Sequence, residues 1–249
     1  MTMFEGDDDD RTGPVRVING CGKGGVLLLC EHASAHIPAR YGGLGLRADW
    51  RDSHAAWDPG ALALAQVLSS ALNAPLVAGA VSRLVYDCNR PPSSPSAMPE
   101  RSEVVEVPGN VGLTPEARAE RVESVYAPFV AAVEAQLGRA PKALVTVHSF
   151  TPLWHGTPRE TEIGLLHDSD ARLAEAMLAR APQGRVVHLN RPYGPEDGVT
   201  HSLQLHGKGL PNVMIEARND LLTTPKDVQT MAMDLLAMLT PALAEVADA

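Results

Sequence analysis

The amino-acid sequence predicts an α/β protein: a single domain of three layers (α/β/α), in which helices cover both faces of a mostly parallel or mixed sheet. Two observations favour this fold. Short apolar runs alternate with longer segments in which apolar residues recur at helical spacing. Polar side chains that can carry out chemistry directly follow several of the apolar runs. The 249 residues, of which 45% are hydrophobic, are enough for one sizeable core.

The composition excludes several classes of function. A net charge of -9 and a pI near 5.4 provide no basic surface for nucleic acid or for an anionic membrane. The sequence has no run of 18 apolar residues, and its first residues, MTMFEGDDDD, do not predict a secretory signal. Its three cysteines, Cys21, Cys30 and Cys88, are too few for a disulfide framework. We therefore expect a cytoplasmic protein that acts on a small molecule, and the sequence leaves its oligomeric state open.

The N-terminal residues 1–22 are expected to be an acidic, flexible segment, because they contain the run Asp7 to Asp10 and scattered glycines. The catalytic domain would then occupy residues 23–249. The glycine-rich stretch Gly22 to Gly25 lacks the spacing of a phosphate-binding loop and precedes a strand, so we expect no nucleotide site there.

The first half of the domain contains two kinds of apolar segment. Val26 to Leu29 is four apolar residues long and predicts a buried strand. Ala61 to Leu72 has helical periodicity and starts near Asp58 or Gly60. The apolar segments Pro75 to Val77 and Val81 to Tyr86 are then interpreted as short strands.

The second half repeats the alternation after a long loop. Residues 91–113 are rich in Pro, Ser and Gly and are expected to form a surface excursion. Thr114 and Pro115 are typical of a helix start, and this helix is expected to end at Gly138. The later strands are expected at 143–147, 163–166, 186–189 and 213–215, the later helices at 171–180 and from the Thr224–Pro225 pair to about 246, and a polar loop at 190–209.

Four of the expected strands end in the polar groups EHAS, DCNR, HSF and EAR. If these groups meet at one edge of the sheet, they bring together His, Glu, Asp, Asn and Arg. Catalytic zinc takes three nitrogen or oxygen ligands and an open position, with a carboxylate nearby to accept a proton. The residue types at these strand ends fit that requirement.

The sequence resembles the N-formylglutamate amidohydrolase family from about Val26 to Leu239. The segments that carry the resemblance are CEHASAHIPARYGGLGL, WDPGALALAQVLSSALNAPL, SRLVYDCNRPP, TVHSFTP, LNRPY and GLPNVMIEARNDL. More distantly, DCNR, HSF and IEARND are similar to motifs of zinc carboxypeptidases and aspartoacylase-type amidohydrolases. The resemblance implies a phosphorylase/hydrolase-like, zinc carboxypeptidase-like fold and a role in amino-acid catabolism, namely histidine degradation.

One departure from the carboxypeptidase pattern concerns the metal ligands. That pattern has a ligand Glu three residues after the first ligand His, whereas Ala35 follows His32 at this spacing. His32 and His148 are the expected histidine ligands, and Asp58 is the first choice for the third ligand. The alternatives are Glu31, His36 and His54, of which Glu31 is disfavoured because adjacent residues on a continuing strand point to opposite faces.

The resemblance implies a hydrolase that uses one Zn²⁺ per chain, or another divalent metal, to cleave an anionic N-acyl amino acid, with an N-formyl group as the expected acyl group. Glu216 would act as the general base. Asn89 and Arg90 would bind the substrate carboxylate, because a guanidinium matches its planar geometry. Arg83 would stabilise the oxyanion or bind a second carboxylate. Further expected substrate contacts are Ser149, Tyr193 and Arg218, although Arg83 and Arg218 also suit framework salt bridges; His201 and His206 have no assigned role.

Three other interpretations stay open. The same residues suit a metallopeptidase or an aspartoacylase-like deacylase, because the sequence does not define the acyl pocket. A non-catalytic binding protein can keep the same fold. A thiol hydrolase is disfavoured, since Cys30 lies within an apolar strand where a thiol is usually inert.

Overall fold

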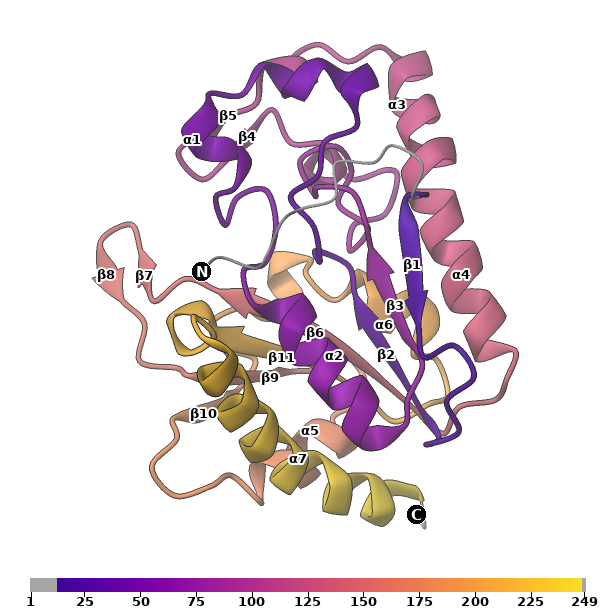
Figure 1. Cartoon of the computed structure of the whole chain (residues 1–249), viewed down its shortest axis with the longest axis vertical. Helices are drawn as coiled ribbons and strands as arrows, with labels where there is room; N and C mark the ends of the chain where they lie inside the picture. The colour runs from indigo at the N-terminus through magenta and orange to yellow at the C-terminus, as the bar shows by residue number, and fades with distance from the viewer. Residues whose placement is uncertain (1–12, 248–249) are drawn as a thin grey trace.

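The computed structural model describes residues 13–247 and contains a seven-stranded mixed sheet with helices on both faces (Figure 1). The expected α/β fold is therefore confirmed. In spatial order the strands are β1 (Val15–Ile18), β3 (Leu76–Gly79), β2 (Val26–Cys30), β6 (Ala143–Phe150), β11 (Asn212–Arg218), β9 (Ile163–Leu166) and β10 (Val187–Leu189).

Strand direction determines where polar side chains gather. The neighbours β3, β2, β6 and β11 are all parallel, so their carboxyl ends lie at the same edge of the sheet. Strands β9 and β10 are parallel to each other, and β9 is antiparallel to β11. The edge strand β1 is antiparallel to β3. The four parallel strands thus deliver the residues that follow them to one common edge.

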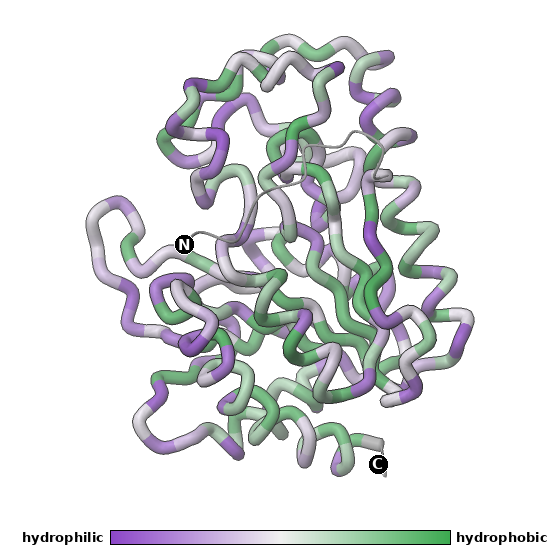
Figure 2. Tube along the Cα trace, in the orientation of Figure 1, coloured by the Kyte–Doolittle hydropathy of each residue, from purple (hydrophilic) through white to green (hydrophobic). Residues whose placement is uncertain are grey.

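Helices cover the two faces of the sheet in separate groups. One face is covered by α2 (Ala61–Leu72), α5 (Arg172–Leu178) and α7 (Pro225–Ala247), and the other by α4 (Ala127–Leu137) and α6 (His201–His206). Strand β2 supplies both cores, because Leu28 contacts the first group and Leu27 and Leu29 contact the second. In Figure 2 the central strands are accordingly hydrophobic and the surrounding loops are largely hydrophilic.

Helix α2 is well determined by its local sequence. Leu64 and Leu68 have no exposed surface and pack against the sheet, so truncating either to Ala is expected to cost about 2–5 kcal/mol. Gly60 precedes the helix with φ of 83°, and a Cβ there would lie only 2.5 Å from the Cβ of Leu222. Both the backbone conformation and the close approach require glycine at this position.

The long helix expected after Thr114 is present but is not α-helical throughout. It consists of α3 (Pro115–Arg121), a π-helical segment η4 (Val122–Tyr126) and α4. The side chain of Thr114 caps it by accepting a hydrogen bond from the Ala117 amide at 3.2 Å. Pro128 has no amide hydrogen and would crowd the preceding turn of a regular α-helix, and the wider π-turn relieves this contact.

The structure corrects two expectations in the middle of the chain. Residues 81–86 form turns and not a strand, because Ser82 accepts a hydrogen bond from the Val85 amide, as in a turn, and donates its own hydroxyl hydrogen to the Ala56 carbonyl. Residues 91–113 are not a simple surface excursion. They contain the hairpin formed by β4 (Arg101–Ser102) and β5 (Val105–Glu106), and several of their side chains are buried, namely Ala97, Met98, Val105, Val107 and Asn110.

Two other segments also differ from expectation. Part of the expected flexible segment, residues 15–18, forms strand β1, while the acidic run Asp7 to Asp10 lies outside the described residues. The expected loop 190–209 contains helix α6.

The remaining elements are short. The β7 (Leu153–Trp154) and β8 (Thr157–Pro158) strands form a second hairpin, which projects at the left of Figure 1. The others are α1 (Ala48–Arg51), η1 (Ala39–Gly45), η2 (Pro95–Ala97), η3 (Pro108–Asn110), η5 (Pro195–Asp197) and η6 (Asn219–Leu221). Among residues 13–247, no helix has the length and apolar character needed to cross a membrane.

Candidate metal centre and active site

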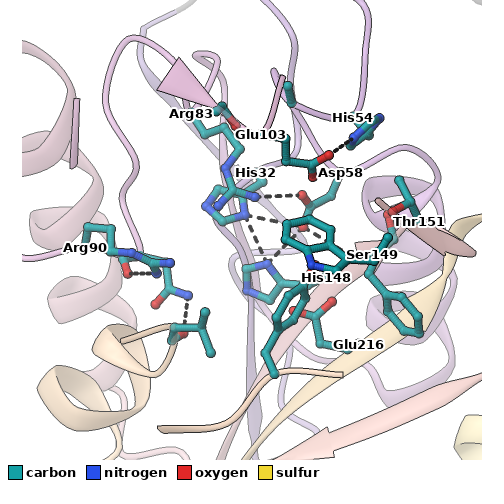
Figure 3. A pocket seen from close by; sticks show the side chains of 17 residues that line it. His32, His54, Asp58, Arg83, Arg90, Glu103, His148, Ser149, Thr151 and Glu216 are labelled. Atoms are coloured by element: carbon teal, nitrogen blue, oxygen red, sulfur yellow. Dashed lines mark hydrogen bonds and ion pairs between the residues drawn. The ribbon is translucent and has the colours of Figure 1, made fainter. Parts of the chain in front are cut away.

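The side chains of His32, Asp58 and His148 converge at the edge of the sheet where the parallel strands end (Figure 3). His32 lies two residues beyond β2, Asp58 lies just before α2, and His148 lies near the end of β6. The Nδ1 atom of His148 is 3.0 Å from Asp58 Oδ2 and 3.2 Å from His32 Nδ1, and His32 Nδ1 is 3.3 Å from the same Asp58 oxygen. All three residues are buried.

These three atoms have the spacing of metal ligands. Tetrahedral bonds of about 2.0–2.1 Å place neighbouring ligand atoms about 3.3 Å apart, close to the three distances in the structure. The three atoms therefore have the mutual spacing of ligands of one ion, and the same three residues line a cavity of about 260 Å³. Two imidazole nitrogens and one carboxylate oxygen are a donor set that suits zinc.

The outer nitrogen of each histidine faces a buried carboxylate. The Nε2 atom of His32 donates to Asp87 Oδ1 at 2.7 Å, and His148 Nε2 lies 3.1 Å from Glu31 Oε2. Because each carboxylate interacts with Nε2, both rings present Nδ1 toward the candidate metal position. Second carboxylates of this kind orient ligating histidines and increase their basicity.

This arrangement also separates the alternative third ligands. Glu31 lies beside the Nε2 edge of His148, whereas Asp58 lies beside Nδ1, so the two carboxylates are placed at different nitrogens of the same ring. Glu31, which directly follows β2, is accordingly outside the ligand group found in the described residues, as expected. His54 instead interacts with Glu103 at 3.1 Å, and His36 is not part of the ligand group found in residues 13–247.

The electrostatics of the site favour a bound cation. Burial raises the pKa of Asp58, but His32, His148 and Arg83 outweigh this effect and hold the pKa well below its usual range. Burial lowers the pKa of His148, but Glu31 and Asp58 more than compensate and raise it. When both histidines are neutral, as metal ligands must be, the three carboxylates of Glu31, Asp58 and Asp87 face one guanidinium, and a divalent cation would balance the two remaining negative charges.

Glu216 lies beside His148 on the neighbouring strand. The two residues are partners in the parallel register of β11 and β6, so their side chains point to the same face. Glu216 lines the cavity, and its buried Oε2 atom has no hydrogen-bond partner among the described residues. Burial raises the pKa of Glu216 to about 7. A carboxylate with these properties can accept a proton near neutral pH.

Arg83 lies between two carboxylates. Its Nη1 donates to Asp58 Oδ1 at 3.2 Å and its Nη2 donates to Asp87 Oδ2 at 2.8 Å. Arg83 therefore orients both the candidate ligand Asp58 and Asp87, which holds His32. Its charge is already balanced by these two partners, which disfavours the expected role of binding a second substrate carboxylate.

The residues of the DCNR segment are placed differently from one another. The Asn89 side chain is almost completely buried, and it donates to the Val199 carbonyl and accepts from the Ser202 amide, so it anchors the start of α6. Arg90 lines the cavity, and it donates hydrogen bonds to two neutral acceptors, the Asn89 carbonyl and Ser96 Oγ. Arg90 is therefore better placed than Asn89 to bind an anionic group.

The other expected substrate contacts are only partly at the cavity. Ser149 and Tyr193 line it, but Ser149 Oγ donates to the Pro59 carbonyl at 2.7 Å. Burial raises the pKa of Tyr193 to about 12, so its phenol stays protonated at neutral pH. Arg218 is not among the lining residues and pairs with Asp220 at 2.8 Å, as in the framework alternative.

Sequence reasoning missed several residues of the site. Asp87 had no predicted role although it stands in the DCNR motif beside expected site residues, and Glu31 was expected only as an alternative metal ligand and not as the partner of His148. Glu103 and Trp154 also line the cavity, but each lies on a hairpin that no sequence pattern connected to the site. His201 interacts with Tyr126 at 2.8 Å, outside the ligand group.

Comparisons with known proteins show the family of the chain. A family model described as N-formylglutamate amidohydrolase matches residues 24–223. Among solved structures, the crystal structure of gene product Atu2144 from Agrobacterium tumefaciens superposes with a TM-score of 0.92 at 52% sequence identity and covers 94% of this chain and 96% of that chain. No curated protein matches. The chain therefore belongs to the N-formylglutamate amidohydrolase family.

Proposed function

We propose that the protein is a zinc-dependent hydrolase that cleaves N-formyl-L-glutamate to formate and L-glutamate. The observation that carries this proposal is the joint position of the three ligand atoms and the unpartnered carboxylate of Glu216 at one cavity, in a member of this family. His32, Asp58 and His148 would hold the metal. Bound there, a divalent cation polarises a carbonyl and acidifies water.

The protein's own groups then have defined tasks. Glu216 takes a proton from the attacking water, whose oxygen bonds to the formyl carbon. It passes that proton to the amide nitrogen as the carbon–nitrogen bond breaks, so formate and the free amine leave. Arg90 binds the α-carboxylate of the substrate and fixes its orientation. The carboxylates of Asp87 and Glu31 keep the two histidine rings in place throughout.

The cavity is consistent with a small substrate. Its volume of about 260 Å³ accommodates an acylated amino acid but leaves little room for a peptide of several residues. The three cysteines are free and suit a reducing, cytoplasmic compartment. We place the reaction in amino-acid catabolism, where formylglutamate is an expected intermediate of histidine degradation.

The test is hydrolysis of a panel of N-acyl amino acids by protein of measured metal content. We expect release of glutamate from N-formyl-L-glutamate, about one zinc per chain, and loss of activity on chelation that zinc restores. Faster cleavage of N-acetyl-L-aspartate or of a C-terminal peptide bond would favour the deacylase or peptidase interpretation instead. Absence of hydrolysis by metal-loaded protein on every substrate would refute the proposal.

A further inference from the structure

Two arginines, Arg83 and Arg90, line the active-site cavity, and Arg83 already faces carboxylates. Arg83 pairs with Asp58 and Asp87, and His54 pairs with Glu103. Only Arg90 has no carboxylate partner among the described residues that line the cavity. N-formyl-glutamate carries two carboxylates at neutral pH, so one charged group of the proposed substrate has no evident receptor on the cavity surface.

A third arginine, Arg159, lies directly behind one wall of the cavity, against three of its aromatic side chains. Its guanidinium is surrounded by three aromatic rings, at 4.7 Å from Trp154, 4.9 Å from Tyr193 and 5.4 Å from Phe150. All three rings line the cavity. Arg159 thus stands one side chain away from the space that the substrate would occupy.

The hydrogen bonds of Arg159 leave its charge uncompensated. Its Nη2 donates to the Tyr193 hydroxyl at 3.0 Å, and its Nη1 donates to the carbonyl and the hydroxyl oxygen of Thr151 at 3.2 and 3.4 Å. These acceptors are all neutral, and no carboxylate in residues 13–247 pairs with Arg159. A guanidinium has five N–H donors. The three bonds therefore leave two donors available to an anion.

The backbone around Arg159 is held in place. The Arg159 amide donates to the Pro152 carbonyl at 2.8 Å across the β7–β8 hairpin, and Arg218 Nη1 donates to the Arg159 carbonyl at 3.0 Å. Thr151, a hydrogen-bond partner of Arg159, and Arg90 lie on opposite sides of the three candidate metal ligands in Figure 3. Arg159 therefore contacts two residues of the cavity wall, Thr151 and Tyr193, and Thr151 lies across the candidate metal ligands from Arg90.

We propose that Arg159 binds the side-chain carboxylate of the substrate and makes the enzyme specific for N-acylated acidic amino acids. This inference rests on the proposed function and adds to it the residue that recognises the side-chain carboxylate. The carboxylate would reach the free N–H donors of Arg159 beside the Tyr193 hydroxyl and the Trp154 ring. The aromatic rings orient the guanidinium without neutralising it, so its charge stays available for the substrate.

The test compares N-formyl-L-glutamate with N-formyl-L-glutamine, which differs only in the charge of the side-chain group. A hydrogen-bonded pair with a charged group is worth about 10–100-fold. We expect wild type to prefer the glutamate substrate by about this factor in kcat/KM, mainly through KM. Arg159→Met, which keeps an unbranched apolar side chain against the rings, should lower the ratio to near 1. Arg159→Lys keeps the charge and should retain part of the preference.

Arg172→Met is the matched control, because Arg172 pairs with Asp170 and does not line the cavity. It should leave the ratio unchanged. Equal losses of Arg159→Met on both substrates, or an unchanged ratio, would overturn the inference, and so would a wild type without preference. Thermal unfolding of each variant shows whether it is folded. A wild type that cleaves both substrates equally refutes only the role of Arg159, whereas one that cleaves neither refutes the proposed function.

Discussion

Replacing Asp87 by Asn tests whether the carboxylate behind His32 controls metal binding. Asp87 is buried, accepts from His32 Nε2 at 2.7 Å, from Arg83 Nη2 at 2.8 Å and from the Asn89 amide at 2.9 Å. If the amide oxygen of Asn keeps the bonds to His32 and Asn89, its NH₂ group faces the Arg83 donor. Two donors then oppose each other, and the ring of His32 loses its charged partner.

The expected magnitudes follow from these contacts. Removing the partner of a ligating histidine typically costs about 10–100-fold in metal affinity. If zinc affinity falls about 30-fold, saturating zinc stabilises the variant about 2 kcal/mol less than it stabilises wild type. For a domain of this size, that difference lowers the melting temperature of the zinc-loaded protein by about 4–8 °C. The metal-free protein should lose only about 1–3 kcal/mol, because Arg83 is partly exposed and keeps its bond to Asp58.

The assay is a zinc titration against a competing chelator, together with thermal unfolding of the metal-free and zinc-loaded forms. Asp170→Asn is the control, because it removes a carboxylate that pairs with Arg172 at 2.7 Å, away from the ligand group. It should leave zinc affinity unchanged. An Asp87→Asn protein that binds zinc within about 2-fold of wild type would show that Asp87 does not position His32.

The remaining predictions concern the ligand, the base and the carboxylate receptor. His148→Ala should lose stoichiometric zinc in elemental analysis, and retention of both zinc and full activity would show that the metal site is elsewhere. Glu216→Gln should keep fold and zinc but lose about 10²–10⁴-fold in turnover, and a loss of only a few-fold would rule out its role as base. Glu216 must be ionised to act as the base, and burial raises its pKa to about 7, so kcat/KM should fall as the pH drops through that region. A bound cation favours the carboxylate and would shift this fall to lower pH. The same fall in the pH profile of Glu216→Gln would contradict this assignment. Arg90→Ala should lose most activity on N-formyl-L-glutamate and little on its fully amidated analogue, and equal losses on both would indicate that Arg90 has a structural role.

The amino-acid sequence by itself determined the elements whose apolar pattern is strong and local. Helix α2 begins and ends where its periodicity does, and β9 matches the expected strand at both ends. The motifs also supplied the chemical types of the site, because the residues at the ends of β2, β6 and β11 meet wherever parallel strands share an edge. These features depend on residues that are close together along the chain, and the pattern of such residues can be read directly from the sequence.

The tertiary structure alone decided features that depend on long-range contacts. An apolar run shows that residues are buried, but not where their backbone hydrogen bonds go, so 81–86 was mistaken for a strand. Whether Glu31 faces the metal position or the outer edge of His148 depends on how the chain leaves β2, which no periodicity describes. The three aromatic rings around the Arg159 guanidinium come from β6, the β7–β8 hairpin and the loop after β10. Such a group of residues is brought together only when the chain has folded.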